Sequence, residues 1–303
     1  MLLSQKLRAY LQLMRPANIV TAIADILAGA AASGAILTIM SNFNESVDYL
    51  TNLLWLVATT VGLYGGGVVF NDVFDARLDQ EERPERSIPR GDVSVREGGM
   101  LGGILLAVGI LCAAQVSVAS FVIATAVAVC ALLYDAWGKH QLIFGPINMG
   151  LCRGGNLLLG ISLVPATIAD YWYLSLIPVV YIAAITMVSR GEVHGDNRMA
   201  LWGGAGLYGI VILSLAILVI REQSGWVAFV FLALFTSQIY PPLFKAIRHA
   251  QPQLIGKAVK AGVISLIILN AVFASIFASG IFGLLVLLLL PLSIWLARFF
   301  AVT

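Results

Sequence analysis

The sequence predicts an all-α membrane protein, a polytopic bundle of about ten transmembrane helices. Three observations lead to this fold class. Of the 303 residues, 60% are hydrophobic and only 11% are charged, about half the charge of a typical soluble domain. Apolar segments of roughly 18 or more residues, long enough to cross a bilayer as helices, recur along the whole chain. The basic residues fall almost entirely on one side of the bundle that these segments would form.

The first expected element is an amphipathic helix over residues 1–16, where Lys6, Arg8 and Arg15 lie among leucines and favour the membrane surface. Apolar runs then predict the spans. These are 17–40, 52–70, 98–115, 117–134, 145–168, 171–190, 201–220, 225–241, 259–279 and 281–301. The only long polar connection, 71–97, contains the helix-breaking stretch "RPERSIPRGD". No boundary divides the chain, so we expect residues 1–303 to form a single domain.

The connections between spans sort into two sides by charge. Seventeen of the eighteen Lys and Arg residues lie on one side, and only Arg221 lies on the other. Positive charge accumulates on the cytoplasmic side of membrane proteins. We therefore expect an integral, multi-pass protein of a bacterial inner membrane, with the polar connection 71–97 in the cytoplasm.

An acidic cluster follows the glycine-rich end of the second span. At about 100° per residue on a helix, Asn71, Asp72, Asp75 and Asp79 fall within an arc of roughly 100°. This face would present three carboxylates and a carboxamide, and oxygen ligands of this kind are what Mg²⁺ selects. The alternative for such an acidic run is a solvated face with surface ion pairs.

A second acidic pair, Glu192 and Asp196 in "MVSRGEVHGDNR", follows the sixth span on the same side. The two clusters can face each other across a bundle and hold Mg²⁺ against a diphosphate, whose departure as a leaving group the metal would assist. Basic residues on that side would complete the neutralisation. They are Arg86, Arg90, Lys139, Arg153 and Arg190. A structural helix cap is the alternative role for Glu192.

At this point the residues resemble a known family. "NDVFDARLD" followed by "RSIPRGDVS" is similar to the UbiA superfamily of intramembrane prenyltransferases, which shows N-D-x-x-D-x-x-x-D and then a basic loop ending in R-P-L-P-S-G. The first motif matches Asn71, Asp72, Asp75 and Asp79. The loop matches at Arg86, Pro89 and Gly91 and departs at Ser87 and Arg90.

Further marks of the family follow in the same order. Its Y-x-x-x-x-K is matched by Tyr134 and Lys139, and its second D-x-x-x-D by Glu192 and Asp196, with Glu in place of the first Asp. The opening "MRPANIVTAIADILAG" also resembles the family. The variant "SRGEVHG" is similar to an EboC-like branch from bacterial secondary-metabolism clusters.

The resemblance implies a bundle of about nine to ten transmembrane helices around a central cavity, and it implies roles for individual residues. The metal ligands would be Asn71, Asp75, Asp79, Glu192 and Asp196, and the four carboxylates among them would be catalytic. The substrate-binding residues would be Asn18, Asp72, Arg86, Tyr134, Lys139 and Arg153. Lys139 and Arg86 would hold diphosphate oxygens, Tyr134 would shield an allylic cation, and Asp72 would orient a basic residue. For Lys139 and Arg86 a lipid-headgroup contact is the alternative, and for Tyr134 an interfacial anchor.

Two ionisable residues lie within the expected spans, where such groups are functional by default and need a partner. Arg153 is flanked by Asn148 and Asn156, and either Asp135 or the diphosphate would serve as its partner. Asp25 lies seven residues after Asn18, so the two share a helix face.

The implied reaction is Mg²⁺-dependent transfer of a prenyl group from a prenyl diphosphate to a small, commonly aromatic acceptor within the lipid bilayer; no nucleic-acid partner is expected. The first alternative is a non-catalytic protein of the same family that binds or carries a lipid or secondary metabolite. An ion-coupled transporter is disfavoured because no internal repeat is evident. A phospho-alcohol transferase is disfavoured because the sequence lacks D-G-x-x-A-R.

Overall fold

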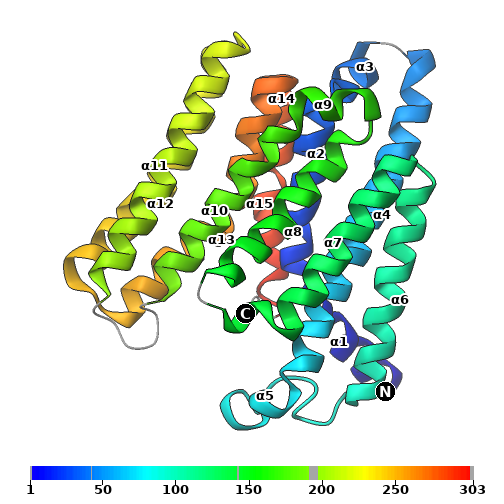
Figure 1. Cartoon of the computed structure of the whole chain (residues 1–303), viewed down its shortest axis with the longest axis vertical. Coiled ribbons are helices and arrows are strands. Elements are labelled where there is room, and N and C mark those ends of the chain that lie inside the picture. Colours follow the sequence, from blue (N-terminus) through cyan, green and yellow to red (C-terminus); the bar gives the residue numbers. More distant parts are fainter. Residues whose placement is uncertain (1, 42, 142, 191–196, 301–303) are drawn as a thin grey trace.

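The computed structural model describes residues 2–41, 43–141, 143–190 and 197–300, and every regular element in these parts of the chain is a helix. The long helices run roughly side by side, and the polar segment between α4 and α6 lies at one end of the bundle (Figure 1). The all-α membrane fold expected from the sequence is confirmed.

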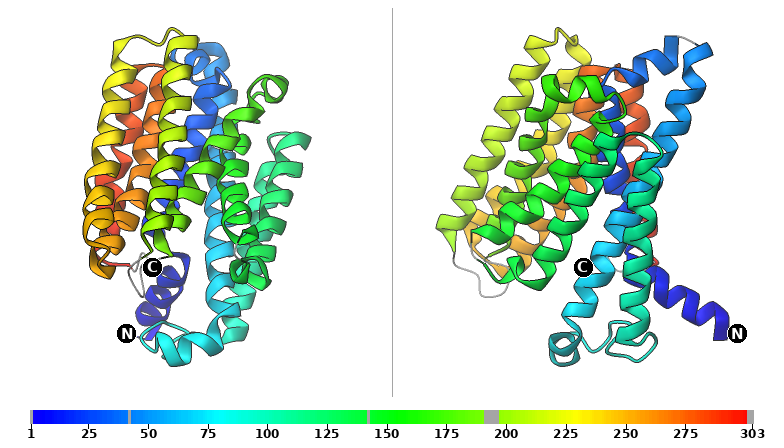
Figure 2. Two further views of the ribbon diagram at one scale, coloured as in Figure 1. Left: turned by 60° about the vertical axis from the view of Figure 1, so that its left-hand side comes forward. Right: turned by 45° about the vertical axis from the view of Figure 1, so that its right-hand side comes forward.

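The first half of the chain supplies one side of the bundle. Its helices are α1 (Leu2–Met14), α2 (Pro16–Ala32), α3 (Ala35–Ser41), α4 (Phe43–Phe74), α5 (Ala76–Glu82), α6 (Val95–Ala114), α7 (Val118–Ala136) and the 3-10 turn η1 (Gly138–His140). Helix α1 meets α2 at an angle of 45° and projects from the bundle at the end that carries α5 (Figure 2).

The second half completes the bundle. Its elements are α8 (Phe144–Ile161), η2 (Pro165–Thr167), α9 (Ile168–Tyr171), η3 (Trp172–Ser175), α10 (Leu176–Ser189), α11 (Arg198–Arg221), α12 (Trp226–His249), α13 (Pro252–Phe277), α14 (Gly280–Leu287) and α15 (Leu289–Leu296). Helices α2 and α8 pack against each other in the middle, with α10 to α13 on one side and α4, α6 and α7 on the other (Figure 1).

Each of the ten expected spans falls on a helix, but not all of these helices are complete spans. Seven described helices are long and apolar enough to cross a membrane, or eight if the bent pair α1–α2 counts as one span. The expected span 17–40 is interrupted after α2, where Gly34 adopts a φ of 80°. The expected span 281–301 consists of two short helices, α14 and α15. The expected connection 71–97 also contains a helix, α5.

Glycines allow the central helices to approach closely. A Cβ on Gly29 of α2 would lie 2.2 Å from the Leu157 carbonyl oxygen of α8, and a Cβ on Gly160 would lie 2.5 Å from the Ile26 carbonyl oxygen. Helix α4 meets α6 in the same way, since a Cβ on Gly62 would lie 2.5 Å from the Leu105 carbonyl oxygen. In lipid, where apolar surfaces gain little by leaving the solvent, such backbone proximity drives helix association.

Candidate active site at the end of helix α4

The site begins where α4 ends. Asp75 has φ −87° and ψ 0° and separates α4 from α5, although the Asp75 amide still donates to the Asn71 carbonyl oxygen and the Asp79 amide to that of Asp75. The prediction that residues 71–79 form one uninterrupted helix is therefore wrong. Across the break, Asp72 and Asp79 share Arg86, whereas Asp75 pairs with Lys139.

Asp72 and Asp79 are joined through two arginines. Arg15 donates to Asp72 at 2.7 Å, and Arg86 bridges the two carboxylates, at 3.3 Å from Asp72 and 2.7 Å from Asp79. Arg15 occupies the bend between α1 and α2 in a left-handed conformation, with φ 49°, which costs a non-glycine residue about 1–2 kcal/mol. The bend brings the N-terminal segment, α4 and the loop after α5 to one place.

Asp75 is held from the other side of the cluster. Lys139 of η1 forms an ion pair with Asp75, and the Asn71 carboxamide donates to the Asp135 carboxylate at 2.9 Å. Tyr134 precedes Asp135 near the end of α7 and is half-buried. Tyr134 and Lys139, which match one motif in the sequence, therefore also lie near each other in the structure. Helix α7 and η1 bring both residues to the end of α4.

Burial ranks the three aspartates. The side chain of Asp75 is 19% exposed, whereas those of Asp72 and Asp79 are 8% and 6% exposed. Removing one partner of such a buried ion pair leaves an uncompensated charge, which is far costlier than losing a surface ion pair. Asp75 is the most accessible carboxylate, and its partner Lys139 has a long, flexible side chain that can turn to a bound anion.

The donor set suits Mg²⁺ in its chemistry. Asn71, Asp75 and Asp79 offer only oxygen ligands, and Mg²⁺ is usually held by one or two carboxylates together with substrate phosphates rather than by an all-protein cage. Within the residues that the structure describes, no three His, Cys, Asp or Glu side chains gather into a metal-binding group. By their oxygen donors, Asn71, Asp75 and Asp79 fit a metal that is bound jointly with a phosphate ligand.

The other two expected ligands, Glu192 and Asp196, lie outside the described residues. The helices that flank them are α10, which ends at Ser189, and α11, which begins at Arg198. Whether this pair faces the end of α4 remains a prediction.

Arg153 lies deeper, and its partner differs from the one expected. Its guanidinium is 3.1 Å from the Asp25 carboxylate, and its Nη2 donates to the Thr21 carbonyl oxygen at 3.1 Å. The expectation that Asp135 would serve is wrong, because Asp135 pairs with Asn71 at the end of the bundle. Arg153 also lies over the ring of Tyr64, 5.8 Å from its centroid.

Further polar side chains complete a buried network around Asp25. The carboxylate accepts from Asn270 of α13 at 2.6 Å and from Asn156 of α8 at 3.1 Å, and Asn156 in turn accepts from Thr60 of α4 at 2.8 Å. Asn18, on the first turn of α2, lies within hydrogen-bonding reach of the Tyr64 hydroxyl. The network thus links four helices within the span region.

Several members of these clusters escaped sequence reasoning. Arg15 was noted only for its charge, and Thr21, Tyr64 and Asn270 were not considered. An asparagine in an apolar span, such as Asn270, is the one signal that pointed to a buried network, because such a group needs a hydrogen-bonding partner in the bilayer.

The helical bundle and the charged cluster at one of its ends define a multi-pass membrane protein with a polar site near the end of its fourth helix. A model of the UbiA prenyltransferase family matches residues 30–200, more than half of the chain. The chain belongs to this family. The EboC-like branch within it stays a prediction.

Curated relatives share a modest part of the sequence. The digeranylgeranylglyceryl phosphate synthase of Methanosarcina mazei is 29% identical over 204 residues, which cover 64% of this chain and 66% of that protein. The synthase of the same name from Ignicoccus hospitalis is 30% identical over 194 residues, which cover 63% of this chain and 59% of that protein. The chain thus spans about two thirds or less of the length of these relatives.

Solved structures extend the likeness over most of the chain. A structure reported for digeranylgeranylglyceryl phosphate synthase in membranes matches with a TM-score of 0.65 and 21% identity, covering 89% of this chain and 97% of that one. A UbiA homologue from Archaeoglobus fulgidus, bound to GPP and Mg²⁺, matches with a TM-score of 0.59 and 16% identity, covering 92% and 99%. These matches show the fold.

Proposed function

We propose that this protein is an Mg²⁺-dependent prenyltransferase that moves a prenyl group from a prenyl diphosphate to a small acceptor within the membrane. The observation that carries the proposal is the cluster at the end of α4. There, Asp72, Asp75 and Asp79 lie among three cations, Arg15, Arg86 and Lys139. The names of the curated relatives and the GPP and Mg²⁺ bound to a structural neighbour support the same reaction class.

The cations of the cluster would bind the diphosphate. Lys139 pairs with Asp75, and Arg86 pairs with Asp79 and, at a longer distance, with Asp72. A phosphate oxygen offers the same charge-assisted hydrogen bond that a carboxylate does. The entering diphosphate would take these donors, and Asp75 and Asp79 would become available as ligands. Asp72, held by Arg15 and Arg86, would keep the arginine side chains in place.

Asn71, Asp75 and Asp79 would hold Mg²⁺ at this end of the bundle, and Glu192 and Asp196 would add the second set of ligands. When bound, the metal supplies charge neutralisation for the departing diphosphate. The side chains of Lys139 and Arg86 stabilise the same negative charge from the protein side.

The acceptor side of the pocket would involve residues deeper in the bundle. Tyr134 lies beside Asp135 and close to the cluster, where its ring could stabilise positive charge on the prenyl carbon. Asn18 and Arg153 contribute polar groups to the network near Tyr64. The family resemblance implies an aromatic acceptor, whereas the names of the relatives describe a glyceryl phosphate product. Both acceptor classes are to be tested.

The orientation belongs to the same proposal. The loops that carry the motifs would face the cytoplasm, because they hold nearly all of the positive charge. A bacterial inner membrane remains the expectation from the sequence; the curated relatives come from archaea such as Methanosarcina mazei and Ignicoccus hospitalis.

Diphosphate release from purified protein tests the proposal. With Mg²⁺, geranylgeranyl diphosphate and either an aromatic acceptor or geranylgeranylglyceryl phosphate, which one further transfer would convert to the product named for the relatives, we expect release coupled to prenylation. Asp75→Ala should lower the rate roughly a hundredfold or more, because it removes both a metal ligand and the partner of Lys139. The matched control is Asp92→Ala, which removes an exposed aspartate that pairs with Arg90 in the neighbouring loop.

Two results would go against the assignment. An active Asp75→Ala variant would show that Asp75 is not a functional residue of the active site. Wild-type protein that binds prenyl diphosphates of several chain lengths but releases no diphosphate with either acceptor would favour the non-catalytic lipid-binding alternative.

A further inference from the structure

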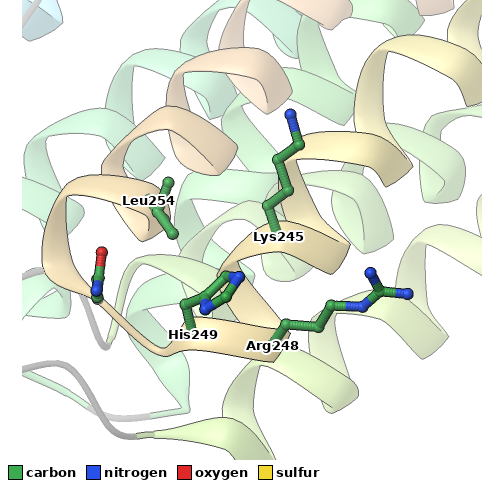
Figure 3. A pocket seen from close by; sticks show the side chains of 5 residues that line it. Lys245, Arg248, His249 and Leu254 are labelled. Atoms are coloured by element: carbon green, nitrogen blue, oxygen red, sulfur yellow. The ribbon is translucent and has the colours of Figure 1, made fainter.

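A second polar site lies away from the aspartate cluster, at the turn that joins α12 to α13. An open pocket of about 510 Å³ forms there. Its lining residues are Lys245, Arg248, His249, Gln251 and Leu254. In Figure 3, Lys245 and Arg248 extend from α12 in different directions, with His249 and Leu254 to the left of Arg248, so the two long basic side chains would turn to meet a common ligand. The volume of the pocket lies within the range of small-ligand sites.

The pocket carries positive charge that the nearby sequence does not neutralise. After Glu222 the chain contains no Asp or Glu, but it contains five basic residues in addition to His249. These are Lys245, Arg248, Lys257, Lys260 and Arg298. Across the parts of the chain that the structure describes, no carboxylate forms an ion pair with Lys245 or Arg248. The pocket is therefore suited to an anion.

The backbone adds to this preference. Ala250 adopts a left-handed conformation with φ 49°, which turns the chain sharply and places the first turn of α13 beside the last turn of α12. Gln251 precedes α13 without a side-chain cap. Pro252 has no amide hydrogen and the Leu254 amide donates to the Gln251 carbonyl oxygen, so the start of α13 contributes mainly the positive end of its helix dipole. Arg248 and His249 also complement the negative end of α12. The dipole of that helix is equivalent to about half a unit of negative charge there, which offsets only part of the positive charge of these side chains.

Exposed aromatic residues beside the pocket favour a position near the lipid headgroups. Phe244, next to Lys245, stacks on Tyr240 at 5.3 Å and contacts Trp202 of α11 at 6.4 Å between ring centroids. Trp202 and Phe244 are exposed on the outer surface of the helices. Exposed aromatic residues near helix ends mark the membrane–water interface. A ligand in the pocket can thus have its anionic group in water and an apolar part along α12.

We propose that this pocket is a binding site for a phosphate group, held by Lys245, Arg248, His249 and the start of α13. The phosphate belongs to an anionic lipid headgroup or to a small soluble phosphate compound. Basic pockets between helix ends on the cytoplasmic side bind lipid phosphates by this chemistry. The site does not depend on the proposed prenyl transfer, and it lies on different helices from the aspartate cluster.

Native mass spectrometry of the full-length protein in detergent tests the site. The protein is titrated with short-chain phosphatidylglycerol, short-chain phosphatidylcholine and inorganic phosphate. We expect phosphatidylglycerol or inorganic phosphate to bind, and the variant Lys245→Gln/Arg248→Gln to bind that ligand about tenfold or more weakly, since charge-assisted hydrogen bonds are lost. The matched control is Lys257→Gln/Lys260→Gln, which removes the same charge from the same hairpin without altering the pocket lining.

The three ligands distinguish a lipid phosphate from a soluble phosphate, and they also define the results that would contradict the proposal. Preferential binding of phosphatidylglycerol assigns the site to a lipid headgroup, and preferential binding of inorganic phosphate assigns it to a soluble compound; either upholds the proposal. Equal binding of phosphatidylcholine, equal losses in the two double variants, or unchanged binding in the pocket variant would overturn it. If the pocket double variant unfolds, the single variants Lys245→Gln and Arg248→Gln give the same comparison.

Discussion

Individual side chains divide between two polar regions with different environments. Asp75 and Lys139 lie at the end of α4, where part of the Asp75 side chain remains accessible. Asp25 and Arg153 lie within the span region and are almost fully buried, at 2% and 7% exposure of their side chains. Burial of this kind makes exchange of partners costly. We therefore propose that Lys139 and Asp75 exchange partners when diphosphate and Mg²⁺ bind, and that Asp25 positions Arg153.

The buried pair gives a prediction about stability. Asp25→Ala should lower the free energy of unfolding by about 3 kcal/mol or more, because it leaves the Arg153 charge unpaired at membrane depth. The double variant Asp25→Ala/Arg153→Met should recover part of the loss, since it removes the charge as well. Thermal unfolding of the purified variants in one detergent measures both. A single variant as stable as the wild type would show that Arg153 has another partner.

The packing of helices and loops brings these residues together, and the sequence predicted only part of this arrangement. Spacing placed Asn71, Asp75 and Asp79 on one side of a helix, and the ion pairs place all three at one end of the bundle. The break at Asp75 could not be read from "NDVFDARLD", because the partners of Asp75 and Asp79, Lys139 and Arg86, lie outside that stretch. The partner of Arg153 depended in the same way on α2 packing against α8.

The close packing of α2 on α8 gives a second prediction. Gly160→Ala should lower the unfolding temperature, at a cost of about 1–3 kcal/mol, because the added Cβ would lie 2.5 Å from a backbone oxygen that cannot move independently. Gly103→Ala in α6 is the matched control: nothing lies within 4 Å of its Cβ position, and alanine favours a helix over glycine. Equal effects of the two substitutions would contradict the close approach of α2 and α8.

At the scale of the whole molecule, hydropathy and charge identified a polytopic helical bundle, and the ten expected segments all fall on helices. The number of complete spans was less predictable. Helix α8 has buried polar residues that lower its hydropathy, although it packs in the centre of the bundle. Hydropathy measures composition, whereas the environment of α8 is set by neighbouring helices that satisfy its polar groups.

The charge asymmetry predicts an orientation. Helix α11 runs from Arg198 at the end that carries α5 to Arg221 at the opposite end (Figure 1). In a variant with its native cysteines replaced, a cysteine at Gln223 should react with a membrane-impermeant maleimide in intact cells. A cysteine at Arg83 should react only after permeabilisation. The reverse pattern would place the motif loops outside the cell.

The central claim, that the end of α4 binds the diphosphate of a prenyl donor, is tested most directly by a cryo-EM map of the full-length protein with Mg²⁺ and a prenyl thiodiphosphate. The account predicts phosphates between residues 71–79 and residues 192–196, with Lys139 and Arg86 donating to them. Phosphates bound elsewhere, with Lys139 still on Asp75 and Arg86 still on Asp79, would contradict it.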